Sequence, residues 1–220
     1  FLDAREKAPK NASSDMYLDE NGEFVRKRSL DGALAAAIPG LPAALAYIAE
    51  HYGELPLTES LAPAIQLART GFEVGPRYRR MATFRAQSFV DYPVGAGIFL
   101  KEGASPPVGY RVVQEDLART LESIGSDSAQ SFYHGLLASK LVKGVRNRGG
   151  IWTSSDLEDY TVKKRAPLVS DYNGIKIVSA PPPSSGGVVL IQALNILERY
   201  PLRSFSLVDR THLVIESMRL

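Results

Sequence analysis

Residues 166–187 read APLVSDYNGIKIVSAPPPSSGG, and this stretch carries the most definite structural prediction in the chain. Two apolar-rich runs flank Asn173-Gly174, a dipeptide typical of the two-residue turn that joins antiparallel strands. The three prolines that follow Ala180 end the second strand, because proline has no N–H to donate to a ladder. We therefore predict a β-hairpin near 166–180, followed by a helix that begins at Ser184-Ser185-Gly186-Gly187.

Outside this hairpin, apolar residues recur mainly at helical spacing. Short strand pieces are expected near 1–25, and a loop rich in proline and glycine is expected over 91–111. The predicted fold class is α+β, predominantly helical with a few short strands. Helices are predicted near 42–52, 60–70, 78–90, 113–124, 128–146, 154–160 and 188–199, and a last one after Ser206 or Asp209.

The amino-acid composition and charge exclude several classes of function. The 220 residues are 45% hydrophobic, which fits a globular protein with a core. Lys plus Arg total 26 against 24 acidic residues, so a net charge of +2 gives no argument for nucleic acid or an anionic membrane. The absence of cysteine excludes disulfides and thiolate nucleophiles. No apolar run approaches the roughly 18 residues of a membrane span, and the first residues lack a signal-peptide pattern.

Several motifs invite a chemical interpretation and do not support it. The run Pro181–Gly187 precedes a helix, but a phosphate loop needs a lysine where Val188 stands. We interpret its serines as helix caps and its glycines as sites of close backbone packing. The three histidines, His51, His134 and His212, are far apart and form no metal-ligand pattern. Arg77 and its neighbours to Arg85 are interpreted as a solvated face rather than a nucleic-acid surface.

Arg5 lies in the opening run Phe1–Pro9, which is expected to be extended. A guanidinium is the natural bidentate partner of a substrate carboxylate. Asp3 and Glu6 flank it and are candidates to hold it in place. On residue chemistry alone, the default interpretation of Arg5 is a solvent-facing charge.

Several segments in the same order resemble the γ-glutamyltransferase (γ-glutamyltranspeptidase) family of N-terminal-nucleophile hydrolases. No single segment is decisive, but the ordered set spans almost the whole chain and is specific. The segments are Asp3–Pro9, Ser29–Gly32 with Ile38–Pro42, Leu61–Ala68, Gly149–Trp152 with Asp156-Leu157, Ser179–Gly187, His212 and Glu216–Arg219.

The resemblance implies a four-layer αββα parent fold made as one precursor that cleaves itself into a large and a small subunit. The N-terminal Thr of the small subunit would attack the γ-glutamyl amide of glutathione, and water or an amino acid would take up the acyl group. Arg5 would bind the α-carboxylate of the γ-glutamyl substrate. The resemblance implies neither a cofactor nor a metal, and it suggests a periplasmic or extracellular protein.

By this resemblance, residues 1–220 are expected to be part of a large subunit, truncated at both ends, and the nucleophile is expected beyond Leu220. Three alternatives stay open. Two are sister activities on the same fold, a cephalosporin/glutaryl acylase and a poly-γ-glutamate transpeptidase. The third is a non-enzymatic helical scaffold, which would gain support if these residues were a whole gene product.

We predict that the purified 220-residue chain neither cleaves itself nor transfers γ-glutamyl groups, since this interpretation places the nucleophile outside it. The measurement is the release of p-nitroaniline from γ-glutamyl-p-nitroanilide, followed by absorbance. Release by the 220-residue chain above the buffer rate would contradict the prediction.

Overall fold

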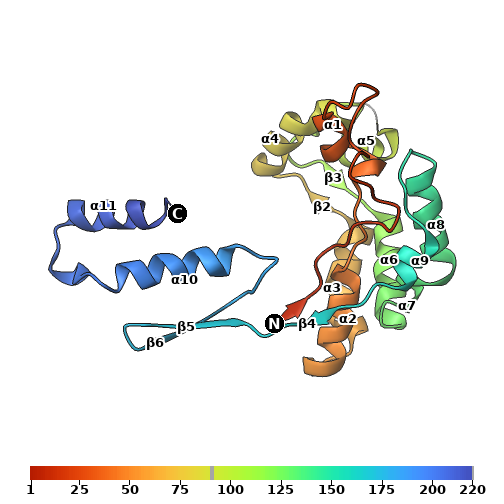
Figure 1. Cartoon of the computed structure of the whole chain (residues 1–220). Helices are drawn as coiled ribbons and strands as arrows, with labels where there is room; N and C mark the ends of the chain where they lie inside the picture. Colours follow the sequence, from red (N-terminus) through yellow and green to blue (C-terminus); the bar gives the residue numbers. More distant parts are fainter. Residues whose placement is uncertain (90–91, 220) are drawn as a thin grey trace. The chain divides into compact units, whose positions relative to one another are not determined.

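The computed structural model describes residues 1–89 and 92–219, and the chain divides into two compact units. One unit comprises Ala4–Thr161, and the other comprises Phe1–Asp3 together with Val162–Leu220. Figure 1 shows helices dominating both units, with short strands between them. The prediction of a predominantly helical α+β fold is therefore confirmed.

The unit Ala4–Thr161 is a helical assembly with one short ladder, β2 (Phe72–Glu73) paired antiparallel with β3 (Arg111–Val112). Two 3-10 turns, η1 (Ala33–Ala35) and η2 (Ala86–Phe89), accompany its helices. The helices are α1 (Arg26–Leu30), α2 (Leu41–Tyr52), α3 (Leu57–Thr70), α4 (Pro76–Arg85), α5 (Pro93–Phe99), α6 (Glu115–Ser126), α7 (Gln130–Tyr133), α8 (Gly135–Arg146) and α9 (Ser154–Glu158).

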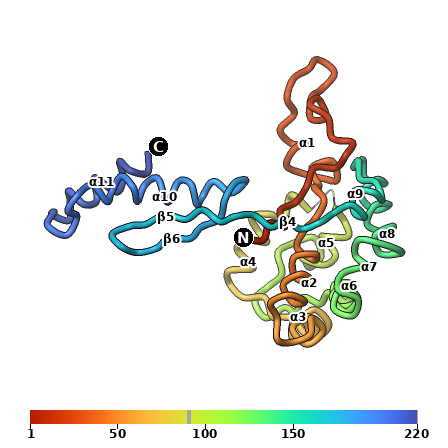
Figure 2. The backbone as a smooth tube through the Cα atoms, turned by 60° about the horizontal axis from the view of Figure 1, so that its bottom comes forward, coloured from red at the N-terminus to blue at the C-terminus, as the bar shows by residue number. Residues whose placement is uncertain are grey.

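The core of this unit lies where α3 and α6 pack side by side, with α2 against both (Figure 2). Small residues allow this close approach, because Ala68 and Ala118 are buried on the facing helices. The fully buried Val74 and Val112 continue the core under the β2–β3 ladder. Burial follows helical periodicity only in part, because Ala68 and Ile124 are buried while Leu41, Ile48 and Tyr52 of α2 are exposed.

The second unit contains the predicted hairpin, β5 (Leu168–Tyr172) and β6 (Ile175–Ser179), in antiparallel register. Asn173 and Gly174 both have positive φ, as a two-residue hairpin turn requires. The Asp171 carboxylate accepts the Gly174 N–H at 2.9 Å and thereby closes the turn. β1 (Leu2–Asp3) pairs with β4 (Lys163–Lys164), α10 (Gly186–Leu197) packs on β5, and α11 (Leu207–Ser217) packs on α10.

Three predicted boundaries were wrong. The expected loop 91–111 contains α5, because Pro93 pre-sets the first helical turn. α3 begins three residues before the expected cap Ser60, so that Pro63 lies inside the helix, where packing against α6 outweighs the lost donor. The expected helix 128–146 breaks at His134, which is extended and precedes Gly135 with a φ of 74°.

The predicted helix 78–90 is divided between α4 and η2 within the described residues. Residue 90, at the end of that helix, and residue 91, at the start of the expected loop, lie outside the described residues. Within 1–89 and 92–219, no helix combines the length and apolar character needed to cross a bilayer.

Candidate functional site

Arg5 lies in residues 4–10, hereafter the Arg5 segment, which has no regular secondary structure beyond a bridge at Lys7 and a turn at Lys10, and which belongs to the larger unit. Its side chain is 54% exposed, and its Nε lies 3.4 Å from Glu6 Oε1. Glu6 therefore contacts Arg5, as expected. The Asp3 carboxylate, the other candidate to hold Arg5, accepts a hydrogen bond from Arg165 Nε at 2.6 Å. The guanidinium of Arg5 is accessible to a solute.

The backbone of the Arg5 segment, by contrast, is tied down at several points. Lys7 and Ile38 exchange both backbone hydrogen bonds, at 3.1 and 2.8 Å, in an isolated antiparallel bridge. Ile38 is almost fully buried, as is Pro9 in the segment itself. The segment is thus anchored in the core while its charged side chains face outward.

A buried carboxylate provides the second anchor. Asp156 is 5% exposed, and its Oδ1 accepts the Lys10 N–H at 2.8 Å. Its Oδ2 accepts both the N–H and the hydroxyl of Thr153 at 2.7 Å, which forms the capping box of α9. One carboxylate therefore begins a helix and holds the N-terminal segment against it.

The pKa of Asp156 reflects two opposing effects. Burial raises the pKa of the carboxyl, because it disfavours the charged form. The hydrogen bonds from Lys10 and Thr153 stabilise the carboxylate and outweigh burial, so that the pKa lies below its ordinary value. Asp156 is accordingly ionised at neutral pH, and each of its hydrogen bonds is charge-assisted.

A third anchor reaches Arg5 itself. The Tyr160 hydroxyl donates to the Arg5 carbonyl oxygen at 2.9 Å, across 155 positions of sequence. Gly40 makes room for this contact, because a Cβ at that position would collide with the Tyr160 hydroxyl and with the Ala4 carbonyl. Tyr160 stacks on Tyr133, with ring centroids 5.6 Å apart and planes 14° from parallel.

The two stretches that carry these anchors are also joined to each other. Trp152 Nε1 donates to the Ala36 carbonyl at 2.8 Å, and Tyr133 donates its hydroxyl to the Pro39 carbonyl at 2.9 Å. The residues around Ile38 and those around Asp156 therefore form one support beneath the Arg5 segment.

The structure shows what the other predicted candidates do. Gly187 packs so closely on the Ala180 carbonyl that a Cβ would collide with it, as expected from the packing interpretation of Pro181–Gly187. The serine-cap prediction was wrong, because Ser185 makes no side-chain capping bond to α10. His51 stacks on Tyr47 at 3.9 Å. Among residues 1–89 and 92–219, no acidic or histidine cluster is arranged to hold a metal ion.

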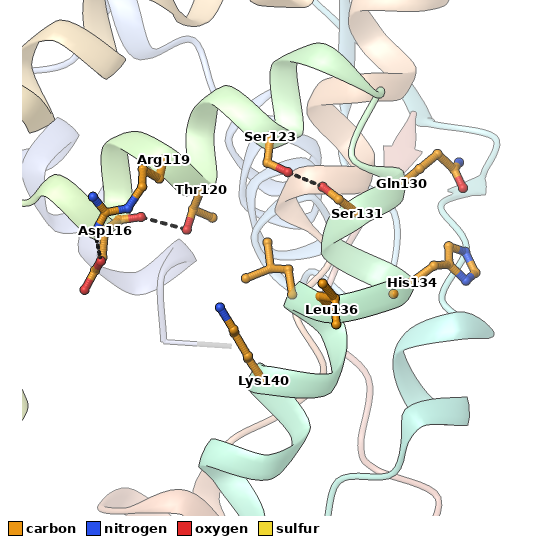
Figure 3. A pocket seen from close by; sticks show the side chains of 11 residues that line it. Asp116, Arg119, Thr120, Ser123, Gln130, Ser131, His134, Leu136 and Lys140 are labelled. Atoms are coloured by element: carbon orange, nitrogen blue, oxygen red, sulfur yellow. Dashed lines mark hydrogen bonds and ion pairs between the residues drawn. The ribbon is translucent and has the colours of Figure 1, made fainter.

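A cleft of about 810 Å³ lies on the same unit, between α6 and the start of α8 (Figure 3). Its hydroxyls are already paired, since Ser123 Oγ lies 2.6 Å from Ser131 Oγ, and Arg119 pairs with Asp116. The His134 ring is directed away from both serines (Figure 3). Arg5 is not among the lining residues, and the cleft presents no activated nucleophile.

Sequence reasoning named Arg5 and missed the residues that fix it. The signal for Asp156 was present, because Thr153-x-x-Asp156 is a capping pattern, but nothing local pointed to Lys10. Tyr160 and Gly40 carry no recognisable motif of their own. Their roles depend on contacts between segments that are distant in sequence.

Comparisons with known proteins agree over the whole chain. The family model described as gamma-glutamyltranspeptidase matches residues 1–220. A glutathione hydrolase proenzyme of a Pseudomonas species is 40% identical over 100% of this chain, and this chain spans 39% of that protein. The crystal structure of Helicobacter pylori γ-glutamyltranspeptidase superposes with a TM-score of 0.94 at 39% identity, covering 99% of this chain and 63% of the other. The Acylase ACY 1 proenzyme of another Pseudomonas is 34% identical over 100% of this chain and 41% of its own length.

We predict that Asp156→Asn lowers the free energy of unfolding by about 2–3 kcal/mol, because charge-assisted bonds to buried backbone groups are lost. Urea unfolding of the full-length protein measures this. Asp159→Asn is the matched control, since that exposed carboxylate pairs with the exposed Lys10 ammonium, and exposed ion pairs contribute little to stability.

The loss of unfolding free energy in Asp156→Asn should also depend on pH. A lowered folded-state pKa stabilises the fold above the unfolded value of 3.8 and loses this effect as the pH falls through the folded value. The difference between wild type and Asp156→Asn should therefore narrow below pH 3.8. A difference that stays constant with pH, or an equal loss in Asp159→Asn, would contradict this assignment.

Proposed function

Because this chain belongs to the γ-glutamyltranspeptidase family, we propose that the full-length protein transfers or hydrolyses the γ-glutamyl group of glutathione and related amides. The chain spans 39% and 35% of the first two curated relatives, both glutathione hydrolase proenzymes. The activity is accordingly proposed for the whole protein. Residues 1–220 would supply part of the large subunit.

The observation that carries the proposal is the form of the Arg5 site. An exposed guanidinium projects from a backbone that three separate contacts hold in place. Two parallel N–H donors match the two oxygens of a carboxylate, so that Arg5 suits the α-carboxylate of a γ-glutamyl substrate. A fixed backbone limits the entropy that is lost when the substrate binds.

In the proposed reaction, Arg5 orients the substrate and makes no bond to the reacting carbon. The N-terminal Thr of the small subunit would attack the γ-carbonyl, expel the amine and form an acyl-enzyme. Water or an amino acid would then release the glutamyl group. Holding the α-carboxylate places the γ-carbonyl at one distance from the nucleophile, and such positioning accounts for much of the rate in acyl transfer.

The small subunit is also the proposed partner of the smaller unit. In the β5–β6 hairpin of the smaller unit, Val169, Ile175 and Val178 are each about three-fifths exposed. In α11, Leu207 and Val208 are more than two-thirds exposed. Apolar surface of this extent is typical of an interface. We propose that other parts of the longer protein cover it. Export to the periplasm or the cell exterior belongs to the same proposal and rests on the family relationship.

An acylase relative and a structural neighbour described as a cephalosporin acylase support a second candidate function, acylase activity on cephalosporin or glutaryl amides. Both substrate classes present a carboxylate to Arg5, so Arg5 alone does not choose between them. Comparing the kcat/KM of the full-length protein for glutathione and for a glutaryl amide separates the two. A large preference for glutathione would support γ-glutamyl transfer.

We predict that Arg5→Ala in the full-length enzyme raises the KM for γ-glutamyl-p-nitroanilide by roughly 100-fold, about 2.7 kcal/mol, because a charge-assisted bidentate contact is lost. Arg5→Lys keeps the charge but not the fork, so its KM should rise by roughly tenfold. Arg77→Ala, at another exposed arginine, is the control and should leave KM unchanged. Unchanged KM and turnover in Arg5→Ala would return Arg5 to the solvent-facing interpretation.

A further inference from the structure

We infer that Tyr160 is a positioning residue for the γ-glutamyl substrate, acting through its hydrogen bond to the Arg5 carbonyl. The inference rests on the proposed function of Arg5. Tyr160 is 7% exposed and donates from its hydroxyl at 2.9 Å. It therefore holds the backbone of the residue whose side chain meets the substrate.

The geometry explains why a backbone contact matters here. The Arg5 side chain is more than half exposed, and its Nε lies 3.4 Å from Glu6 Oε1. Its backbone, in contrast, is held by a buried group, the Tyr160 hydroxyl. The position of the Arg5 Cα therefore helps to determine where the guanidinium lies. A displacement of about 1 Å in a substrate-binding group can lower the rate by orders of magnitude.

The Tyr160 ring is itself fixed. It stacks on Tyr133, and the Tyr133 hydroxyl donates to the Pro39 carbonyl at 2.9 Å while it accepts the Ala43 N–H at 3.2 Å. Burial raises the pKa of Tyr133 to about 12, so this hydroxyl keeps its proton at neutral pH. The stacking on Tyr133 therefore helps to hold the Tyr160 hydroxyl in place against the Arg5 carbonyl.

Gly40 completes the arrangement from the opposite side. A Cβ at position 40 would collide with both the Tyr160 hydroxyl and the Ala4 carbonyl, the carbonyl immediately before Arg5. The glycine thus lets the loop after Ile38 close onto the contact. Gly40 and Tyr160 therefore meet at the Arg5 segment, and Tyr133 supports Tyr160 from behind.

The test is Tyr160→Phe in the full-length enzyme, which removes the hydroxyl and keeps the stacked ring. We expect the KM for γ-glutamyl-p-nitroanilide to rise roughly tenfold, with kcat changed less than KM. The matched control is Tyr78→Phe, which removes another tyrosine hydroxyl that donates to a carbonyl, that of Phe99 at 3.1 Å. A purely structural role would lower the melting temperature in both variants and leave KM alike in both.

The double variant Arg5→Ala/Tyr160→Phe tests whether Tyr160 acts on substrate binding through Arg5. If Tyr160 acts through Arg5, Tyr160→Phe adds nothing to the KM of Arg5→Ala. Additive effects, or an unchanged KM in Tyr160→Phe alone, would overturn the positioning role while leaving the proposed function intact. An Arg5→Ala variant with wild-type KM would instead overturn the proposed function, and this inference with it.

Discussion

The carboxylate of Asp156 is the constraint on which the rest of the Arg5 site depends. It is buried, ionised and bonded to three donors, two from Thr153 and one from Lys10. Burying a charge is unfavourable unless hydrogen bonds replace its water, and here they do. Because the same group begins α9 and captures the N-terminal segment, it brings Tyr160 within reach of Arg5. Losing it would remove one of the three anchors that hold the Arg5 segment.

The resulting site combines a rigid backbone with an exposed charged group. This division suits a residue that must recognise a small anionic substrate, because a preorganised backbone reduces the entropic cost of binding and an exposed side chain is accessible to the substrate. The cleft beside α6 and α8 is not the proposed site, because Arg5 does not line it. Within it, the hydroxyls of Ser123 and Ser131 pair with each other, and Arg119 pairs with Asp116.

Local signals predicted local structure. Asn173-Gly174 predicted the hairpin because the turn type requires positive φ at both residues, and of the two expected starts for the last helix, Ser206 and Asp209, the structure has Ser206 as the cap of α11. Two prolines were misjudged: Pro63 lies inside α3, which packs on α6, and Pro93 begins α5 where a loop was expected. Arg5 was identified by resemblance rather than by its chemistry. Tyr160 could not be predicted, because its partner lies 155 residues away.

The central claim is that Arg5 binds the α-carboxylate of the substrate, and a series of substrate analogues tests it most directly. The kcat/KM values of wild type and Arg5→Ala would be compared on γ-glutamyl-, glutaryl- and 4-aminobutanoyl-p-nitroanilide. The glutaryl compound lacks the α-amino group, and the 4-aminobutanoyl compound lacks the α-carboxylate. The account predicts a large loss on the first two substrates and none on the third. An equal loss on all three would contradict it.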